Sequence, residues 1–444
     1  MRGLLFGILL LTASVAGHAA NGPKEEVGAK PYMGWSSWSL QSTKVSPYGG
    51  KWLTQKHLTE QSNALKKTLQ PYGYKYFNID SGWSGGFDAY GRPAPNKKTF
   101  PGGMAGMAKI VHGNGQKLGI YWIPGVGSDV YKANPPIKGT KYHVRDIVAK
   151  PLRPGNAFGA WHLKIDYKKP GAQAFINSIV EQFASWGVDF LKLDGVCPGS
   201  DKDISYCDNR ADVAAYWTAI RKSPRPIWMT VSWKISPTQI PFWQNHSHAR
   251  RIDDDVESYN DKLATWSQIR ARFTDAAAWA GHTGRGGKTN GAPRAGWNDL
   301  DSLNIANGSF DGLTNDEKQT AAAFWALQCA PLYTGDDLTK LDPFGLSILT
   351  NKSLIAINQA GYAAKEIQGD DAPIWAISNP DGSYSVGLFN LSDLNTVVTL
   401  DFSQMKKNGD YEIWDYWTQS LIGHVKDSYP VLLAPHACSL VRVK

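Results

Sequence analysis

A short apolar run that ends on a carboxylate is the first sign of chemistry in this chain. Residues 190–193 (Phe-Leu-Lys-Leu) are too few and too apolar for an amphipathic helix, so they predict a buried strand that ends at Asp194. A helical pattern over 171–186 precedes this strand, and Gly187 is suited to end that helix. A carboxylate at the end of a buried strand is costly unless it is paired or functional, although an aspartate there can also cap a loop.

Other charged residues suggest acid–base chemistry. Lys192 precedes Asp194 by two residues, so both side chains point to the same face of the strand. An ammonium group in that position favours the ionised carboxylate. Farther along the chain, Asp253, Asp254 and Asp255 form a triple acid, in which like charges raise the pKa of a neighbour, as a proton-donating acid requires. Alternatively, Asp253 or Asp254 is a solvated loop charge or the partner of an arginine.

Strand-like and helix-like segments alternate along most of the chain, and they must position these acids. Strands are predicted within 30–39, 74–80, 117–122, 190–193, 225–232, 250–256, 295–301 and 331–337, and helices at 54–69, 103–113, 171–186, 212–221, 263–280 and 315–329. Acids recur where the strands end, which is where catalytic groups lie in a barrel. The pattern predicts an α/β fold, a (β/α)8 TIM barrel over residues 21–360. An open doubly wound sheet is disfavoured, because no phosphate-binding turn follows the first strand.

The C-terminal part has a different pattern, with short alternating runs separated by Gly, Asn, Asp and Pro. This predicts a small C-terminal antiparallel β-sandwich domain over residues 361–444, for which a structural role is favoured over independent glycan binding. Within the barrel region, the Gly- and Pro-rich segment 125–167 predicts a long irregular loop that covers strand ends and shapes a cleft.

The N-terminus and the composition exclude several classes of protein. Residues 1–20 combine Met1-Arg2, an apolar run and small residues, which is typical of a secretory signal peptide, and no other apolar run is long enough to span a membrane. The net charge is +8, but Lys and Arg are scattered, so no nucleic-acid partner is expected. We expect an exported protein, secreted or periplasmic, without membrane attachment.

The cysteines and tryptophans narrow the chemistry further. Export permits disulfides, and Cys197 and Cys207 are close enough in sequence to pair across one loop, whereas Cys329 lies in an apolar run and is expected to be a buried free thiol. No Cys-x-x-Cys or His-rich pattern indicates a metal, so neither a metal nor a cofactor is expected. The 18 Trp offer flat faces on which sugars stack, although a large barrel core also buries such residues.

The ordered motifs of the chain resemble those of glycoside hydrolase family 27, the α-galactosidase or melibiase family. The landmarks are Met33-Gly-Trp-Ser-Ser-Trp38, Phe77-Asn-Ile-Asp80, Lys117-Leu-Gly-Ile-Tyr121, Gly187-Val-Asp-Phe-Leu-Lys-Leu-Asp194, Arg251-x-x-x-Asp255, Gly296-Trp-Asn-Asp-Leu-Asp301 and Ala330-Pro-Leu. The resemblance implies a retaining exo-glycosidase, in which two carboxyl groups lie about 5 Å apart. By their match to the family motifs, Asp194 would be the nucleophile and Asp255 the acid/base.

The resemblance also implies sugar-binding residues, and here the chain departs from the family pattern. The positions that match those holding the terminal sugar are Trp38, Asp80, Tyr121, Lys192 and Arg251. However, Ser81 stands where α-galactosidases carry a second aspartate, and Ser232, before Trp233, stands where they carry a glutamate. Trp122 replaces the usual acid after the third strand. Losing a charged partner of a sugar hydroxyl can cost a few kcal/mol, so the sugar is less determined than the reaction.

Three functional hypotheses follow. The first is an exported retaining α-glycosidase that acts on terminal galactosides of oligo- or polysaccharides. The second is the same mechanism applied to α-1,6-glucan or β-L-arabinopyranoside ends. The third is a non-catalytic glycan-binding protein, against which the joint presence of Asp194, Lys192, Arg251 and Asp255 argues, since binding alone does not need the acid pair. The oligomeric state is left open.

Overall fold

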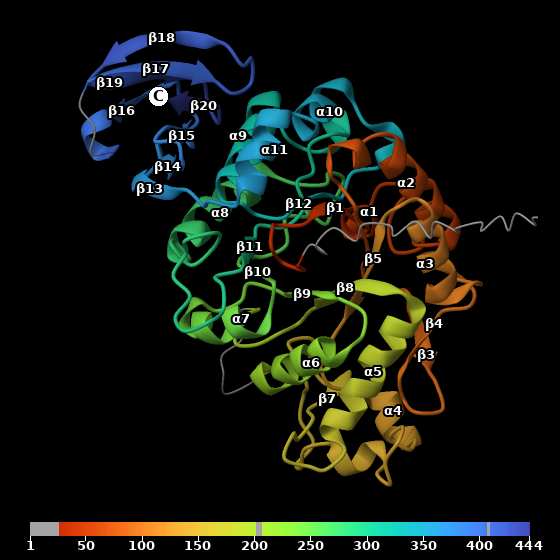
Figure 1. Cartoon of the computed structure of the whole chain (residues 1–444). Helices are drawn as coiled ribbons and strands as arrows, with labels where there is room; N and C mark the ends of the chain where they lie inside the picture. The colour runs from red at the N-terminus through yellow and green to blue at the C-terminus, as the bar shows by residue number, and fades with distance from the viewer. Residues whose placement is uncertain (1–25, 201–206, 406–408) are drawn as a thin grey trace, which may run out of the picture.

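The computed structural model describes residues 26–200, 207–405 and 409–444, which form two parts (Figure 1). A parallel sheet with its helices occupies most of the chain, and an antiparallel β domain, drawn in blue, follows at the C-terminal end. Among the described residues, no helix is both long and apolar enough to cross a membrane. The predicted signal peptide, 1–20, lies outside the described residues.

Eight parallel strands form the barrel. They are β1 (Met33–Ser36), β2 (Tyr76–Ile79), β5 (Lys117–Trp122), β8 (Val188–Leu193), β9 (Trp228–Val231), β10 (Ala249–Arg251), β11 (Trp297–Asp299) and β12 (Leu332–Thr334). Each strand pairs with the next one of this series up to β11, and β1 also pairs with β12, so the sheet curls back on itself. At the remaining junction, the amide of Leu303 donates to the carbonyl of Tyr333 at 2.7 Å. The predicted TIM barrel is confirmed.

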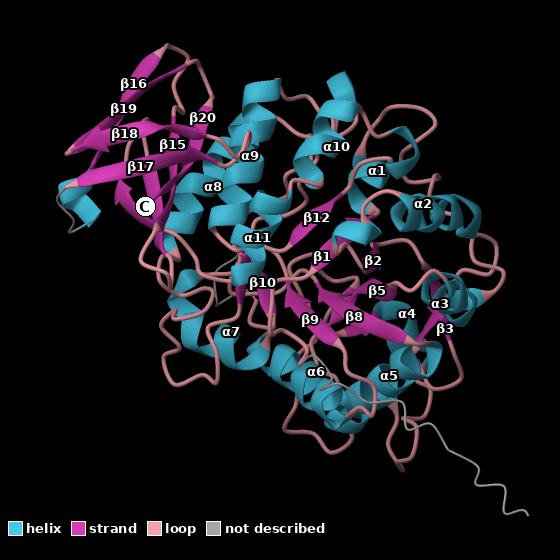
Figure 2. Cartoon of the chain, turned by 45° about the horizontal axis from the view of Figure 1, so that its top comes forward, coloured by secondary structure: helices cyan, strands magenta, loops and turns pink. Residues whose placement is uncertain are grey.

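Helices cover the outside of the parallel sheet (Figure 2). They are α1 (Trp38–Ser42), α2 (Gln55–Lys67), α3 (Gly103–Gly113), α5 (Ala172–Trp186), α6 (Arg210–Lys222), α7 (Ile240–His246), α8 (Trp266–Ala278), α9 (Asn315–Leu327), α10 (Pro343–Leu349) and α11 (Lys352–Ala360). Their ends follow local chemistry. Thr314 and Glu317 form a capping box at the start of α9, and Gly187, with φ 92°, ends α5 as predicted. The sequence analysis missed the short helix α7.

The barrel strands next to the acids are shorter than predicted. β10 ends at Arg251 rather than at residue 256, and β11 covers 297–299 rather than 295–301. Beyond Arg251, the chain makes contacts that replace the sheet ladder: the Asp254 amide donates to Asp253 Oδ1 at 2.7 Å, and the Arg251 guanidinium donates to the Asp254 carbonyl at 2.8 Å. The triple acid, including Asp255, therefore lies in a loop.

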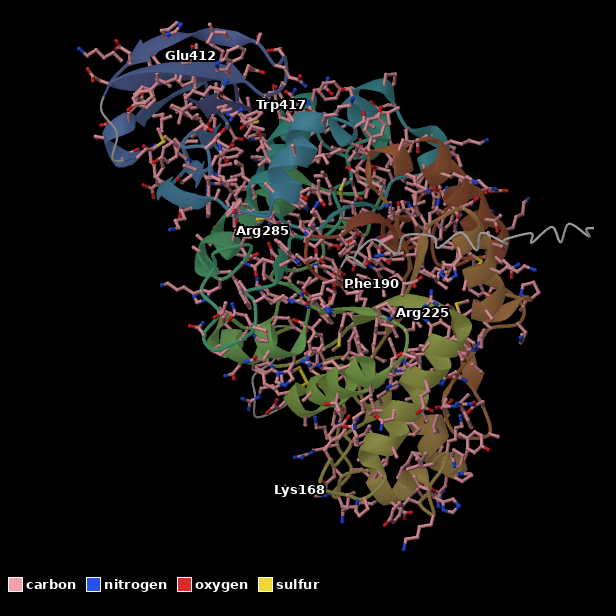
Figure 3. All side chains as sticks on the ribbon, in the orientation of Figure 1. Lys168, Phe190, Arg225, Arg285, Glu412 and Trp417 are labelled. Carbon is pink, nitrogen blue, oxygen red and sulfur yellow. A yellow bond between two sulfur atoms is a disulfide. The ribbon has the colours of Figure 1, made fainter. Side chains whose placement is uncertain are left out.

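The barrel interior is layered, because inward side chains recur every second residue of a strand. The layer nearest the amino ends of the strands, called the aromatic layer below, consists of the buried residues Tyr32, Tyr76, Phe190, Trp228 and Tyr333. The ring centre of Tyr32 lies 5.0 Å from that of Phe190 and 5.3 Å from that of Trp228. Phe190 is labelled inside the barrel in Figure 3.

Residues 125–167 form an ordered insertion, not the irregular loop expected from the sequence. The insertion contains β6 (Val126–Gly127), α4 (Ser128–Ala133) and β7 (His162–Leu163), and β6 pairs antiparallel with β7. A separate hairpin joins β3 (Ser84–Phe87) and β4 (Pro93–Pro95). The insertion reaches the barrel where the Ala157 amide donates to the Gly195 carbonyl at 2.9 Å, so part of it lies beside Asp194.

The C-terminal domain is the predicted antiparallel β-sandwich. Its strands are β13 (Lys365–Gln368), β14 (Ile374–Ser378), β15 (Tyr384–Phe389), β16 (Thr396–Asp401), β17 (Asp410–Asp415), β18 (Leu421–Lys426), β19 (Ser428–Leu433) and β20 (Cys438–Val443). Six of them form a sheet in the order β13-β14-β15-β20-β17-β18, and β16 pairs with β19. The apolar runs identified in the sequence did not include β13, β18 and β19; β13 has one apolar residue and β19 contains Pro430. Phe324 of α9 contacts Trp375 and Phe389, which joins the two domains.

The cysteines behave as the sequence suggested. Cys197 and Cys207 form a disulfide with Cα atoms 5.4 Å apart. Cys329 is a buried free thiol, and burial raises its pKa. The disulfide lies just beyond β8, in the loop that follows Asp194, and it ties together the two sides of that loop.

Candidate active site

Inward side chains at the carboxyl ends of β2, β8 and β10 form one charged cluster. Asp80 follows β2, Lys192 and Asp194 lie at the end of β8, and Arg251 ends β10. Lys192 Nζ lies 2.8 Å from Asp80 Oδ2. It also lies 5.6 Å from the ring centre of Tyr121, its register partner on β5. The structure thus brings together five residues that the sequence analysis singled out.

Lys192 is held in its charged form by the acids around it. Burial lowers the pKa of this ammonium group, but the charges of Asp80, Asp194 and Asp255 outweigh burial, so the pKa of Lys192 lies above its usual value. A charged, fixed ammonium group in a buried site can donate hydrogen bonds to sugar hydroxyls.

Asp194 is buried, with 8% of its surface exposed, and its Oδ1 has no hydrogen-bond partner among the described residues. Its backbone amide donates to the Trp122 carbonyl at 2.9 Å. Burial raises the pKa of the Asp194 carboxyl; Lys192 opposes this effect, and Asp255 and Asp80 add to it. Lys192 does lower this pKa, as expected, but burial of the carboxyl outweighs it, and Lys192 also pairs with Asp80 at 2.8 Å.

Ser232, at the end of β9, lies beside Asp194. It is fully buried, and its amide donates to the Leu193 carbonyl at 2.9 Å. The Ser232 hydroxyl is close enough to lower the pKa of Asp194, but it does not reach the geometry of a formed hydrogen bond, and its Oγ has no partner among the described residues. An unpaired buried polar atom costs about 1–3 kcal/mol. A ligand hydroxyl could satisfy these atoms.

Arg251 joins the two sides of the cluster. Its guanidinium lies 2.7 Å from Asp301 Oδ2 and 3.1 Å from Asp255 Oδ1, and 2% of its side chain is exposed. Burial lowers the pKa of Arg251, but Asp301 and the other acids around it outweigh burial and raise that pKa well above its usual value. Arg251 is therefore a permanent positive charge, and it holds the start of the Asp255 loop.

Asp255 accepts hydrogen bonds at both carboxylate oxygens. Arg251 donates to Oδ1, and the hydroxyl of Tyr259 donates to Oδ2. Burial acts to raise the pKa of Asp255, but Arg251, Lys192 and the Tyr259 hydrogen bond outweigh it, so this pKa lies below its usual value. These contacts therefore hold Asp255 as a carboxylate.

The expectation that Asp253 and Asp254 raise the pKa of Asp255 is wrong. Asp253 pairs with Arg272 at 3.2 Å and lies 3.9 Å from Lys234. Asp254 pairs with Lys234 at 3.2 Å. Both acids turn towards their own cations, because the backbone leaves the sheet after β10, and the alternative interpretation of these residues as cation partners is the one the structure supports.

The remaining predicted site residues lie at the rim of the cluster. Trp38, at the start of α1, donates from Nε1 to the Tyr259 hydroxyl at 3.2 Å. Ser81 is partly exposed and uses its amide to bond Asp80 Oδ1 at 2.7 Å. Trp233 stacks on Phe158 of the 125–167 insertion, with ring centres 5.1 Å apart.

Sequence reasoning missed three residues that lie here. They are Phe158, Glu257 and Tyr259. Only Tyr259 could have been identified from the sequence. It lies four residues after Asp255 and directly before Asn260 and Asp261, which are residue types that favour turns. Glu257 and Phe158 reach the site through contacts between segments that are distant in sequence.

Glu257 is a buried carboxyl next to the acid loop. It accepts hydrogen bonds from Ser39 at 2.6 Å and from Ser302 at 3.2 Å. Burial, with the charges of Asp301 and Asp255, raises the pKa of Glu257 to about 8. Oxygens of Asp255, Glu257 and Asp301 lie within 4.8 Å of one another, but Arg251 already pairs with two of these acids. The Arg251 guanidinium therefore already balances the negative charge of these acids, and we assign no metal to the cluster.

The comparisons with known proteins cover both domains. A family model described as "Alpha galactosidase A" matches residues 30–166 and 159–360, and one described as "Alpha galactosidase C-terminal beta sandwich domain" matches residues 369–443. An α-galactosidase of Oryza sativa is 27% identical over 93% of this chain and 84% of its own length. "Alpha-galactosidase 3" of Hypocrea jecorina is 31% identical over 75% of this chain, which spans about half (53%) of that protein.

Solved structures share the same architecture. The crystal structure of a GH27 β-L-arabinopyranosidase from Geobacillus stearothermophilus is 25% identical, with a TM-score of 0.82, over 94% of this chain and 97% of that one. An α-galactosidase from Mortierella vinacea, at 21% identity and a TM-score of 0.70 over 93% of this chain and 96% of that one, shows the fold alone. The barrel, the β-sandwich and both matching family models lead to one conclusion: this chain is an O-glycosyl hydrolase and belongs to the α-galactosidase family, glycoside hydrolase family 27.

Proposed function

We propose that the protein is an exported, retaining exo-glycosidase that removes terminal α-galactosyl or closely related residues from oligo- or polysaccharides. In the first step, Asp194 attacks the anomeric carbon while the glycosidic bond breaks and Asp255 transfers its proton to the leaving oxygen. In the second step, a water oxygen displaces Asp194 from the anomeric carbon and gives a proton to Asp255.

The observation that carries this proposal is the electrostatic coupling of Asp194 and Asp255. Each carboxyl acts on the pKa of Lys192, and Asp255 raises the pKa of Asp194. The two acids come from different strand ends yet lie in one buried cluster, as a pair flanking a single bond requires. Asp194 is the more buried of the two and has an unpaired oxygen, which suits direct attack.

The sugar is inferred from the polar groups around the pair. Asp80, Lys192 and Arg251 offer charged hydrogen-bond partners, and Trp38 offers an aromatic face, which together suit a pyranose ring. Relatives named α-galactosidases support galactose. A β-L-arabinopyranoside is the second candidate. It is favoured by Ser81, which removes a charge expected near the 4- and 6-hydroxyls, and by the likeness to the Geobacillus arabinopyranosidase.

Export is supported by the sequence of residues 1–20, which has the composition of a signal peptide, and by the Cys197–Cys207 disulfide, since such bonds form in oxidising compartments. Expression of the whole chain with a C-terminal tag, followed by fractionation and N-terminal sequencing, tests this part. A product that retains residue 1 and stays in the cytoplasm would contradict it.

A panel of nitrophenyl glycosides tests the function. It contains α-galactoside, β-L-arabinopyranoside and α-glucoside, with isomaltose oligomers as natural α-1,6-linked substrates. We expect the highest kcat/KM for the α-galactoside or the arabinopyranoside, and proton NMR of the first-formed sugar should show retention of configuration. An inverted product would exclude the double displacement. Binding of these sugars without turnover of any of them would favour a glycan-binding role.

A further inference from the structure

Asp255 poses a problem for the proposed mechanism, because a general acid must carry a proton and reach the leaving oxygen within hydrogen-bond distance. In this structure its two oxygens accept hydrogen bonds from Arg251 and Tyr259. Donors to a carboxylate stabilise its charged form. Both donors therefore act against protonation of Asp255, and loss of either one favours the acid form.

Tyr259 is the donor that is free to move. Arg251 is almost wholly buried, pairs with Asp301 and donates to the Asp254 carbonyl. The side chain of Tyr259, in contrast, is exposed (41% of the residue) and lies in the loop between β10 and α8. Its φ of 58° lies in the left-handed region, which bulky residues adopt rarely.

The loop that carries Tyr259 is anchored on both sides of this residue. The Ser258 amide donates to the Leu263 carbonyl at 3.1 Å, and the Asn260 carbonyl accepts from the Lys44 amide at 2.8 Å and from the Thr43 hydroxyl at 2.8 Å. The backbone is thus held while the Tyr259 side chain projects over the site, so a rotation of this side chain needs no movement of the loop.

The Tyr259 hydroxyl also accepts a hydrogen bond from Trp38 Nε1 at 3.2 Å, and the two rings meet edge to face with centres 6.4 Å apart. Trp38 belongs to the proposed sugar-binding residues and Asp255 is the proposed acid. A side chain bonded to both occupies the space between a proposed sugar-binding residue and the proposed acid, and a leaving oxygen that takes a proton from Asp255 needs the same space.

We propose that Tyr259 is a positioning residue that holds Asp255 in the free enzyme and is displaced by the leaving-group part of the substrate, which frees Asp255 Oδ2 to carry the proton for the leaving oxygen. The proposal rests on the proposed function of Asp255. The proton comes from solvent: the Asp255 carboxylate takes up one proton when the contact breaks and passes it to the leaving oxygen when the glycosidic bond breaks. Tyr259 keeps its own proton throughout.

Other charges around Asp255 stay in place when the Tyr259 hydroxyl is removed. Several titratable groups face Asp255. From the barrel these are Arg251 of β10, Lys192 of β8, Asp194 just after β8, and Tyr121 of β5, and from its own loop they are Glu257 and Tyr259. Asp301, after β11, pairs with the same Arg251. Replacement of Tyr259 by Phe therefore deletes one donor and keeps the ring and every neighbouring charge.

The test compares the pH dependence of kcat/KM, which reports the free enzyme, with that of kcat, which reports the complex. In Tyr259→Phe we expect the alkaline limb of kcat/KM to move up by about one pH unit, which gives about a tenfold higher kcat/KM above that limb. The alkaline limb of kcat should stay where it is in the unchanged protein, because the substrate has already displaced the tyrosine. Tyr72→Phe, on the opposite face of the barrel, is the matched control and should change neither limb.

A second measurement works without substrate. The 13C-carboxyl signal of Asp255, assigned by its loss in Asp255→Asn, should titrate at higher pH in Tyr259→Phe than in the unchanged protein. Tyr259→Asn, which suits the left-handed backbone and lacks the phenol, should behave in the same way. If both variants lose kcat equally at every pH and the Asp255 titration does not move, the proposal is overturned. If no glycoside is hydrolysed by the unchanged protein, the proposed function fails, while the titration still decides whether Tyr259 holds Asp255.

Discussion

The two ends of the barrel interior are built from the same strands but have opposite character. β8 contributes Phe190 to the aromatic layer and, two residues on, Lys192 to the charged cluster, with Asp194 two residues beyond. β2 does the same with Tyr76 and, four residues later, Asp80. The step of two residues keeps all these side chains pointing inward, so only residue identity separates a packed layer from a reactive one.

The polar atoms show what this difference means. In the charged cluster, buried atoms lack hydrogen-bond partners among the described residues, including Asp194 Oδ1, Ser232 Oγ and Arg251 Nε. The aromatic layer is different, because rings fill the space and a buried polar atom there has a partner. For example, Trp228 Nε1 donates a hydrogen bond to the Thr230 hydroxyl at 2.8 Å. Unsatisfied buried groups lower stability. The amino-terminal end therefore contributes folding energy, and the carboxyl-terminal end keeps binding capacity for a ligand at the expense of stability.

The sharpest test of the comparison is Asp194→Asn. If Asp194 is the nucleophile, kcat should fall by roughly 10⁴-fold or more, while the melting temperature at pH 7 should stay or rise, because the substitution removes a buried charge with an unpaired oxygen. Hydrolysis of a nitrophenyl glycoside and calorimetry measure the two effects. Full activity in this variant would remove Asp194 from its proposed role.

Asp255→Ala should have a smaller effect that depends on the leaving group. We expect kcat to fall by about 10²–10⁴-fold for a sugar leaving group, which needs protonation, and much less for dinitrophenol, which does not. Rates for the two substrate types, measured side by side, give the ratio. Equal losses for both would show that Asp255 supports the site without donating a proton.

Phe190→Ala tests the other end of the barrel. The buried ring contacts Tyr32 and Tyr76, so its removal should destabilise the protein by about 3–5 kcal/mol. Urea unfolding measures this loss. In the fraction that stays folded, kcat should change only severalfold, since three residues of β8 separate Phe190 from the reacting Asp194. A loss of kcat as large as that of Asp194→Asn, with unchanged stability, would contradict the division into two layers.

The smallest expected effect is the pH dependence of stability. Several acids among the described residues have raised pKa values, including the buried Asp194, Glu257 at about 8 and Asp299 at about 6. Buried His248, with a pKa lowered to about 3, acts in the opposite direction below pH 6.5. Between pH 6.5 and 8, the folded state therefore binds more protons than the unfolded state, and stability should fall as pH rises. In Glu257→Gln this fall should be shallower, with a gain in melting temperature at pH 8 and almost none at pH 4.5. An equal shift at both pH values would show that Glu257 ionises normally.

Much of this architecture could be predicted from local patterns. The period-two run before Asp194 placed Lys192 on the same face, and the alternation of strands and helices predicted the barrel, since both depend on residues that are close in sequence. The Arg251-x-x-x-Asp255 spacing likewise brought an acid next to its cation, at 3.1 Å.

The missed features depend on contacts between distant segments. The sequence shows three adjacent acids, but Arg272 of α8 and Lys234 after β9 draw Asp253 and Asp254 away from Asp255. Whether a lysine lowers the pKa of a neighbouring aspartate also depends on burial and on the other charges that share it, which a local pattern does not contain.

By itself, the sequence determined which side chains are available and in which order the strands present them: aromatic rings first, then a cation, then a carboxylate. Only the tertiary structure decided how these groups share protons and partners. Trp38 and Tyr259 lie 221 residues apart in the chain, yet they meet over Asp255. The physical reason is that strand periodicity orients a side chain, whereas closure of the barrel selects the charges and hydroxyls that surround it.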